Sequence, residues 1–207
     1  HWAKGWQTAD EYLSGNVRQK LRTAQRVAAR DPFFAGNVDA LIAAQPKDLE
    51  ASEIEVRLGA TWFDKKYIEQ FMYETFETPR YLRGQIEISY VPYTAEWQVS
   101  RKSMVRYNDV AAFTTYGTDR ASAYRLLEDA LNLRDIRIYD TIEDADGRER
   151  RVLNAKETTL AAQKQQLIRD AFKDWIWKDP ERRETLVRQY NEEMNSTRPR
   201  EYDGSHI

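Results

Sequence analysis

The residues with the clearest potential for chemistry are basic side chains near the start of the chain. Arginine recurs at every fourth position, at Arg18, Arg22, Arg26 and Arg30. Side chains with this spacing share one flank of a helix, where they can contact successive phosphates of a nucleic-acid backbone. The alternative interpretation is a solvated helix face that binds nothing. The repeat therefore identifies candidate nucleic-acid-binding residues.

Helix geometry limits how many of these arginines can act together. Each four-residue step turns about 400° on a helix with roughly 3.6 residues per turn, so successive arginines drift by about 40°. The row then sweeps about 120°, and we expect only two or three of its members to contact phosphates at once. A second group of candidate nucleic-acid-binding residues lies beside the predicted strands and consists of Arg101, Lys102 and Arg106.

Residue patterns typical of catalysis are largely missing. There is no Gly-x-x-x-x-Gly-Lys-Ser/Thr loop, and the eight glycines are scattered singly. His1 and His206 are the only histidines and no cysteine is present, which excludes most triads and metal sites built on these residues. The acidic residues before Gly147 do not match a calcium loop, because Ile142 and Leu153 would occupy its first and twelfth positions. We expect no catalytic residue, no metal and no cofactor in this chain.

The run Asp31-Pro32-Phe33-Phe34 superficially resembles the loop with which amino-methyltransferases present a flipped base. That loop has two prolines before its aromatic residue, whereas this run has one and no glycine-rich cofactor loop accompanies it. Asp-Pro after an amphipathic helix more often ends the helix. We therefore interpret the run as a helix stop, and we expect the chain to bind neither ATP nor S-adenosylmethionine.

The composition is that of a folded protein. Of the 207 residues, 41% are hydrophobic and 12% aromatic, which is sufficient for a core. Because the formal net charge is −2, nucleic-acid binding would depend on a local basic patch. No apolar run approaches the roughly 18 residues of a membrane span, and no signal peptide is visible. These features predict a soluble, cytoplasmic protein without a membrane partner.

The clearest structural signals lie in the last quarter of the chain. Apolar residues there recur with the period of an amphipathic helix, at Leu160, Leu167, Ile168, Ala171, Phe172, Trp175 and Ile176. Asp179 suits the N-cap of a second helix and Pro180 its first position. This helix should end before Pro199, because a residue preceding proline is disfavoured in the α region. The sequence predicts a hairpin of helices over 154–177 and 180–195, anchored by Trp175.

Upstream, apolar periodicity predicts further helices over about 9–30 and 37–45, and another that begins at Thr61 or Asp64. Gly15 and Asn16 weaken the first turns of the 9–30 helix, so a start near Ser14 is the alternative. The segment 52–59 fits a short helical turn or a strand equally well. Aromatic residues along the helix after Asp64 favour a core face over a ligand pocket. A helix is also expected after Gly117-Thr118-Asp119, which would cap it.

Alternating residues predict strands in the middle of the chain. A β-hairpin is expected over 86–99, a third extended segment over 111–116, and a type I′ turn at Asp146-Gly147. Because a lone hairpin is marginal in water, we expect these strands to form one small sheet between about 80 and 153. The predicted fold class is α+β, with several amphipathic helices packed on a small, mainly antiparallel sheet and a C-terminal helical hairpin.

Three consecutive segments follow from these elements. Residues 1–79 would form a helical N-terminal part, and residues 80–153 a small sheet with one helix. Residues 154–207 would form the helical hairpin and a tail. We expect the three segments to pack as one compact unit.

The C-terminal segment also resembles a known family. The resemblance is carried by Asp174-Trp175-Ile176-Trp177-Lys178-Asp179-Pro180-Glu181-Arg182-Arg183, by Tyr190-Asn191 and Asn195, and by Arg198-Pro199-Arg200-Glu201-Tyr202-Asp203-Gly204-Ser205-His206. Three further blocks, 8–21, 56–72 and 115–153, resemble the same proteins. These are the very large proteins of phages and conjugative mobile genetic elements in which an adenine-specific DNA methyltransferase is fused to a Swi/Snf-like superfamily-two helicase. The motifs are specific to that family but are not catalytic.

The resemblance implies an intermediate region of a multidomain enzyme. The methyltransferase would precede this chain, and the ATP-binding helicase core would begin after Ile207. One expected function is a non-catalytic accessory domain that helps to engage DNA next to the motor. The other is a protein–protein scaffold that fixes the methyltransferase relative to the helicase without contacting DNA. The aromatic residues Trp2, Trp6 and Trp177 favour the scaffold, because exposed aromatic patches often mark interfaces.

Overall fold

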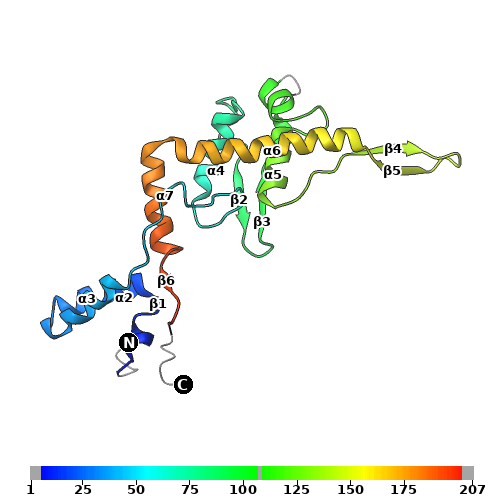
Figure 1. Cartoon of the computed structure of the whole chain (residues 1–207). Coiled ribbons are helices and arrows are strands. Elements are labelled where there is room, and N and C mark those ends of the chain that lie inside the picture. Colours follow the sequence, from blue (N-terminus) through cyan, green and yellow to red (C-terminus); the bar gives the residue numbers. More distant parts are fainter. Residues whose placement is uncertain (1–5, 107–108, 202–207) are drawn as a thin grey trace. The chain divides into compact units, whose positions relative to one another are not determined.

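The computed structural model describes residues 6–106 and 109–201. The fold is α+β, in which helices alternate with small antiparallel sheets (Figure 1). The chain divides into two compact units, one within His1–Ile54 and Glu184–Ile207 and the other within Glu55–Arg183. This division differs from the three consecutive segments expected from the sequence. The first unit joins the two ends of the chain, because β1 (Gly15–Asn16) pairs antiparallel with β6 (Thr197–Arg198).

The N-terminal helix is interrupted rather than continuous over 9–30. The structure has α1 (Ala9–Tyr12) and α2 (Val17–Ala28), separated by the short strand β1. Gly15 causes the break, since its φ of +68° is incompatible with a right-handed helix and favours glycine. The side chain of Asn16 then accepts a hydrogen bond from the backbone N–H of Gln19 and so caps α2.

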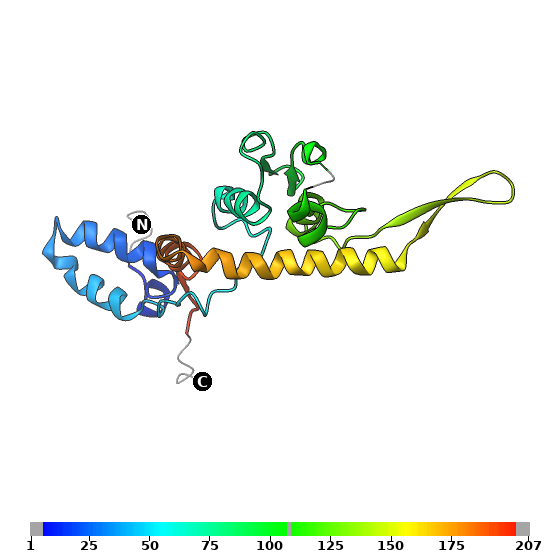
Figure 2. The ribbon, with the colours of Figure 1, turned by 90° about the horizontal axis from the view of Figure 1, so that it is seen from above.

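The core of the first unit lies between α2 and α3 (Ala35–Ala43), which run side by side in Figure 2. Its buried residues are Val17, Ala24 and Leu41, and half-buried residues packed around them are Tyr12, Leu13, Leu21 and Val38. The Asn191 side chain bonds both the N–H and the carbonyl of Leu49, at 2.8 and 2.9 Å. This bidentate contact attaches the segment after α3 to the C-terminal residues of the same unit.

The helices of the second unit begin at side-chain caps that are visible in the sequence. Asp64 caps α4 (Lys65–Thr75), Ser122 caps α5 (Ala123–Leu131) and Asn154 caps α6 (Ala155–Lys178). The expected cap of α5 at Gly117-Thr118-Asp119 was therefore placed too early. α7 (Pro180–Glu193) follows α6 directly after Asp179, and the two helices form the predicted C-terminal helical hairpin.

Aromatic rings from α4, α5 and α6 fill the core of the second unit. Phe71 of α4 packs against Phe172 of α6 at a centroid distance of 5.2 Å, and Phe76 packs against Tyr124 of α5 at 5.3 Å. All four side chains are fully buried. The aromatic stripe along α4 is therefore core, as the sequence favoured.

The buried face of α6 is rotated relative to the prediction. Its buried residues are Ala161, Gln165, Ile168, Phe172 and Ile176. Leu160 and Leu167, which the apolar pattern placed in the core, are 40% and 43% exposed. Gln165 takes a core position because its amide donates to the backbone carbonyls of Leu126 in α5 and of Arg134 after that helix. A polar side chain can be buried when it is satisfied in this way.

The predicted hairpin over 86–99 is confirmed by β2 (Ile88–Val91) and β3 (Glu96–Val99). It does not join the second hairpin, β4 (Tyr139–Glu143) with β5 (Glu149–Leu153), so the expectation of one sheet is wrong. Side chains from α5 and from the residue directly after it occupy the free edge of β3 instead. Glu128 accepts from the N–H of Val99, while Asn132 bonds both the N–H and the carbonyl of Trp97.

The backbone corrects two local predictions and decides a third point that the sequence left open. Residues 111–116 were expected to be extended, but Ala111–Thr115 form one turn of π-helix. The loop between β4 and β5 spans residues 144–148 and has a positive φ at Gly147 alone, so it is not a type I′ turn. The undecided segment 52–59 contains neither helix nor strand, although Ile54, Val56 and Leu58 are buried.

Candidate nucleic-acid interface

The surface of α2 carries the most one-sided charge in the sequence. Between Val17 and Arg30 there are five basic residues and no acidic one. The exposed positions along this stretch are Gln19, Arg22, Gln25, Arg26, Ala29 and Arg30. These residues, called the α2 face below, combine positive and neutral side chains. Such a face suits the backbone of a nucleic acid.

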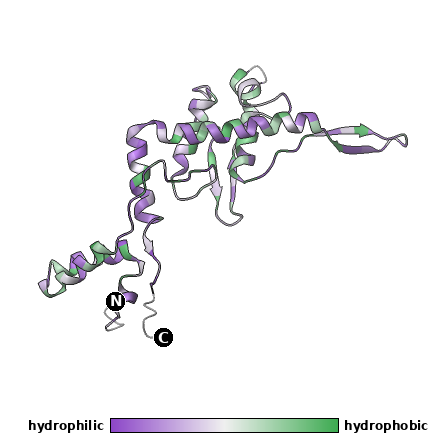
Figure 3. Cartoon of the chain, in the orientation of Figure 1, coloured by the Kyte–Doolittle hydropathy of each residue, from purple (hydrophilic) through white to green (hydrophobic). Residues whose placement is uncertain are grey.

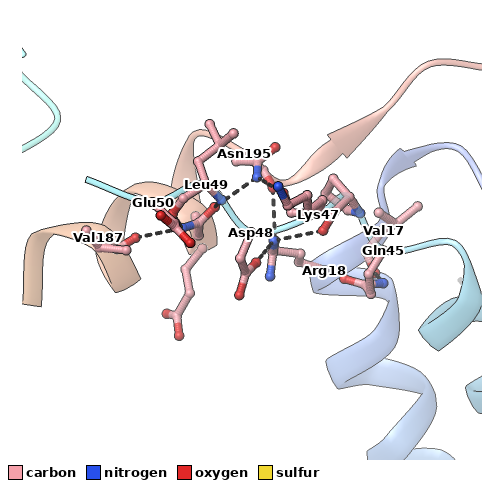
Figure 4. A network of polar contacts seen from close by, with 12 residues as sticks. Val17, Arg18, Gln45, Lys47, Asp48, Leu49, Glu50, Val187 and Asn195 are labelled. Carbon is pink, nitrogen blue, oxygen red and sulfur yellow. Dashed lines mark hydrogen bonds and ion pairs between the residues drawn. The ribbon is translucent and has the colours of Figure 1, made fainter. Parts of the chain in front are cut away.

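Arg18 is the member of the arginine repeat that does not belong to the α2 face. Its side chain is only 17% exposed. Its Nε donates to the carbonyl of Asn195 at 2.9 Å, and its Nη2 contacts the carbonyl of Pro46 and the carboxylate of Asp48 (Figure 4). These contacts hold three segments of the first unit together, so the guanidinium of Arg18 is already occupied.

Arg22 is exposed and forms a surface ion pair. Its Nη2 lies 3.1 Å from Oε2 of Glu192, and the two side chains are 59% and 48% exposed. Ion pairs between exposed side chains contribute at most about 1 kcal/mol, and salt screens them. A phosphate could therefore replace Glu192 as the partner of Arg22 at small cost.

Arg26 and Arg30 complete the basic part of the α2 face. Arg26 contacts the carbonyl of Arg22 and the hydroxyl of Thr23, each at 3.3 Å, and neither contact neutralises its charge. Arg30 follows the end of α2 and is exposed. Among the described residues, no carboxylate forms a salt bridge with either guanidinium. Arg26 and Arg30 are thus the two members of the repeat most open to an anionic ligand.

The run after Arg30 stops the helix, as predicted. The carboxylate of Asp31 accepts the N–H of Phe33 at 3.0 Å and caps a 3-10 turn over Pro32–Phe34. The Phe33 ring is 76% exposed and meets the Phe34 ring edge-to-face at 5.3 Å. Phe33 is not among the candidate residues predicted from the sequence. Its position three residues after Arg30 is the signal in the sequence that could have identified it.

The second basic group belongs to the other unit, and most of it has structural partners. Arg101 has a positive φ of 46° and makes a long contact of 3.5 Å with Gln85. Lys102 pairs with Glu128, the same residue that caps the edge of β3. Arg106 is exposed. Of this group, Lys102 is therefore the least available to a ligand.

The tryptophans proposed as interface markers differ in exposure. Trp6 is 94% exposed, Trp177 is half-buried, and Trp2 lies outside the described residues. Trp175 is also half-buried, between α4 and the start of α7. Its Nε1 donates to Glu74 at 2.7 Å, and the Arg182 guanidinium lies 3.6 Å from its ring centroid. Trp175 thus connects three helices at the turn of the C-terminal hairpin.

The hairpin β4–β5 is the other unusual surface. Nearly all of its residues are exposed, and both hydrophobic and hydrophilic residues occur along it (Figure 3). Its exposed apolar side chains are Ile142, Val152 and Leu153. Glu143 and Glu149 lie directly opposite each other, and such like-charged pairs destabilise a hairpin. At its base, hydrogen bonds from Arg120 and Asn154 lower the pKa of Asp140.

Within the part of the chain that the structure describes, no group of three or more acidic or histidine residues is placed to hold a metal ion. Within the same residues, no helix is both long and apolar enough to cross a membrane.

Comparison with known proteins assigns the chain to a family. Residues 57–196 match the model of a family described as Domain of unknown function (DUF8437), and the chain belongs to this family. No curated protein and no solved structure matches the chain. The matched range covers α4, α5, α6 and α7 but starts after α3, so the α2 face lies outside it.

Proposed function

We propose that this chain is a non-catalytic accessory domain that helps to engage nucleic acid next to a DNA motor. The observation that supports it best is the α2 face, on which Arg22, Arg26 and Arg30 are exposed without an acidic residue on the same helix. A local patch of this kind can bind phosphates although the whole chain is close to neutral. Arg18 serves the fold instead, so two or three arginines would act together.

The place of this domain in a larger protein rests on the resemblance described above. The parent protein would be a cytoplasmic fusion of an adenine-specific DNA methyltransferase and an ATP-dependent helicase from a phage or conjugative element. Its neighbouring methyltransferase and helicase domains would be the protein partners. This chain would supply neither a catalytic residue nor a cofactor site. Arg101 and Arg106 of the second unit are further candidate contacts for nucleic acid.

A salt titration tests the proposal. Each phosphate neutralised by the α2 face adds about 0.9 to the slope of log affinity against log salt on duplex DNA, and about 0.7 on single strands. We expect Arg26→Gln with Arg30→Gln to lower this slope by about one to two units on any sequence. Fluorescence anisotropy with the 207-residue chain would measure it.

A matched control removes two exposed arginines from the other unit, Arg80→Gln with Arg183→Gln, and should leave the slope unchanged. An unchanged slope in the α2 variant, or no binding by the parent chain at low salt, would contradict the proposal.

A second candidate function is the protein–protein scaffold, and the β4–β5 hairpin favours it. A two-stranded hairpin is marginally stable alone in water, and this one exposes Ile142, Val152 and Leu153. A neighbouring domain that covered these side chains would stabilise it. If the parent chain fails to bind nucleic acid at low salt, the scaffold becomes the better account.

A further inference from the structure

We infer that the tip between α2 and α3 binds unpaired bases, so that the preferred ligand of the α2 face is single-stranded nucleic acid. The inference rests on the proposed function and specifies its substrate class. The tip consists of Arg26, Arg30 and Phe33. Arginines would hold the phosphates, and the exposed Phe33 ring would stack on a base.

The backbone at Phe33 is fixed before any ligand binds, and its ring has one aromatic neighbour. Pro32 restricts the backbone at the start of the 3-10 turn, and the Asp31 carboxylate accepts the N–H of Phe33 at 3.0 Å. The half-buried ring of Phe34 supports Phe33 edge-to-face. An aromatic side chain has only two side-chain torsions, so ordering it on a ligand costs little entropy. The ring is 76% exposed and thus accessible to a flat partner.

Charge around the ring favours a polyanionic partner. Arg26 and Arg30 precede Phe33 by seven and three residues and are exposed like it, whereas the carboxylate of Asp31 offsets one positive charge. Cationic side chains beside an exposed aromatic ring are the combination with which proteins bind single strands without sequence preference. An apolar pocket on a protein would match the ring but not the two guanidinium groups.

Geometry distinguishes a single strand from a duplex. In a duplex the base faces are covered by stacking, so Phe33 would have no surface to contact. The arginine positions also drift by about 40° per step around the helix. A flexible single strand can curve with the row and place one base on the ring. DNA and RNA share this chemistry.

The experiment compares ligands of equal length on the 207-residue chain by fluorescence anisotropy. The probes are a thymidine oligonucleotide, a uridine oligonucleotide, an abasic DNA strand and a blunt duplex. We expect Phe33→Ala to weaken binding of the thymidine or the uridine strand about 5-fold to 100-fold, as loss of base stacking does in other proteins. Affinity for the abasic strand and the salt slope should not change. Phe33→Tyr should restore binding.

Tyr93→Ala is the matched control, because Tyr93 is 98% exposed but lies in the β2–β3 turn of the other unit. Circular dichroism would verify that each variant remains folded. The preference between the thymidine and uridine strands identifies the physiological source, and dependence on Phe33 with either strand supports the inference.

The outcomes separate this inference from the proposed function. The inference would be overturned if the chain bound the abasic strand as tightly as the thymidine strand and Phe33→Ala had no effect. If the salt slope were normal in that case, the proposed function would still stand. Self-association of the chain that Phe33→Ala abolishes, with nucleic-acid binding unchanged, would overturn it in favour of a contact between copies. Absence of binding to every probe would overturn both.

Discussion

At the scale of single residues, identical side chains four positions apart have different roles. Arg18 and Arg26 belong to the same repeat, yet Arg18 is inserted between chain segments and Arg26 faces solvent. The carbonyl of Asn195 accepts from Arg18 although the two residues are 177 positions apart. A candidate phosphate contact can therefore be identified only after these long-range hydrogen bonds are known.

Tyr124 gives a prediction at this scale. The fully buried hydroxyl of Tyr124 lies 2.7 Å from the hydroxyl of Thr78. Burial raises the pKa of Tyr124 to about 12. Because the unfolded side chain has a pKa of about 10, the folded state holds its proton longer. This difference in pKa contributes stability to the folded state that is fully present below about pH 10. It is lost as the pH rises from about 10 to 12, by roughly 1.4 kcal/mol per pH unit.

We therefore expect Tyr124→Phe to be less stable than the parent by about 1 kcal/mol at neutral pH, because Thr78 loses a hydrogen bond. Above about pH 10 the difference should shrink and then change sign, since phenylalanine does not ionise. Urea denaturation near pH 8 and near pH 11 would measure both differences. Tyr93→Phe, at a 98% exposed position, serves as the control. A difference that stays constant with pH would contradict the prediction.

At the scale of elements, helices begin where local caps place them, but their buried faces depend on their neighbours. Asp64 and Asn154 cap α4 and α6 through hydrogen bonds to residues two and three positions away. The rotation of α6, by contrast, follows from the contacts of Gln165 with Leu126 and Arg134. Apolar side chains alone would have favoured a face that includes Leu167.

The rotation of α6 is tested by substituting two adjacent residues. Ile168 is fully buried, and Ile168→Ala should reduce the free energy of unfolding by about 2–5 kcal/mol. Leu167 is 43% exposed, and Leu167→Ala should cost less than about 1 kcal/mol. Chemical denaturation of the two variants provides the comparison. Equal losses of unfolding free energy in the two variants would show that the apolar stripe predicted from the sequence, which includes Leu167, describes the buried face of α6 better.

At the scale of the whole molecule, the chain forms two units with separate cores. Leu41 is central to one core and Phe172 to the other, and both side chains are fully buried. The family match from residue 57 to 196 covers nearly all of the second unit and leaves α2 and α3 outside. The unit that carries the α2 face is therefore mostly outside the shared part of the family.

Hydrogen exchange would test the independence of the units. Leu41→Ala should increase amide exchange in α2 and α3, because a cavity in one core raises the opening equilibrium of that unit. The amides of α5 and α6 should keep their protection. Phe172→Ala should have the opposite pattern and is the reciprocal control. An increase in both units after either substitution would favour the single compact unit that the sequence predicted.

The sequence by itself determined those features that depend on neighbours along the chain. Caps such as Asp64 act within a few residues, the alternation of apolar residues specified the β2–β3 hairpin, and Asp31-Pro32 ended the helix. The absence of histidine pairs and cysteines likewise needs no structure.

Tertiary structure decided which surfaces remain free. Whether the second edge of β3 pairs with a further strand depended on Glu128 of α5 and on Asn132 directly after it, which bond that edge. The availability of each arginine depended on distant partners, Asn195 for Arg18 and Glu192 for Arg22. Such pairings join residues far apart in the sequence. Which residues pair depends on packing and desolvation over the whole unit. A residue pattern along the chain does not contain that information.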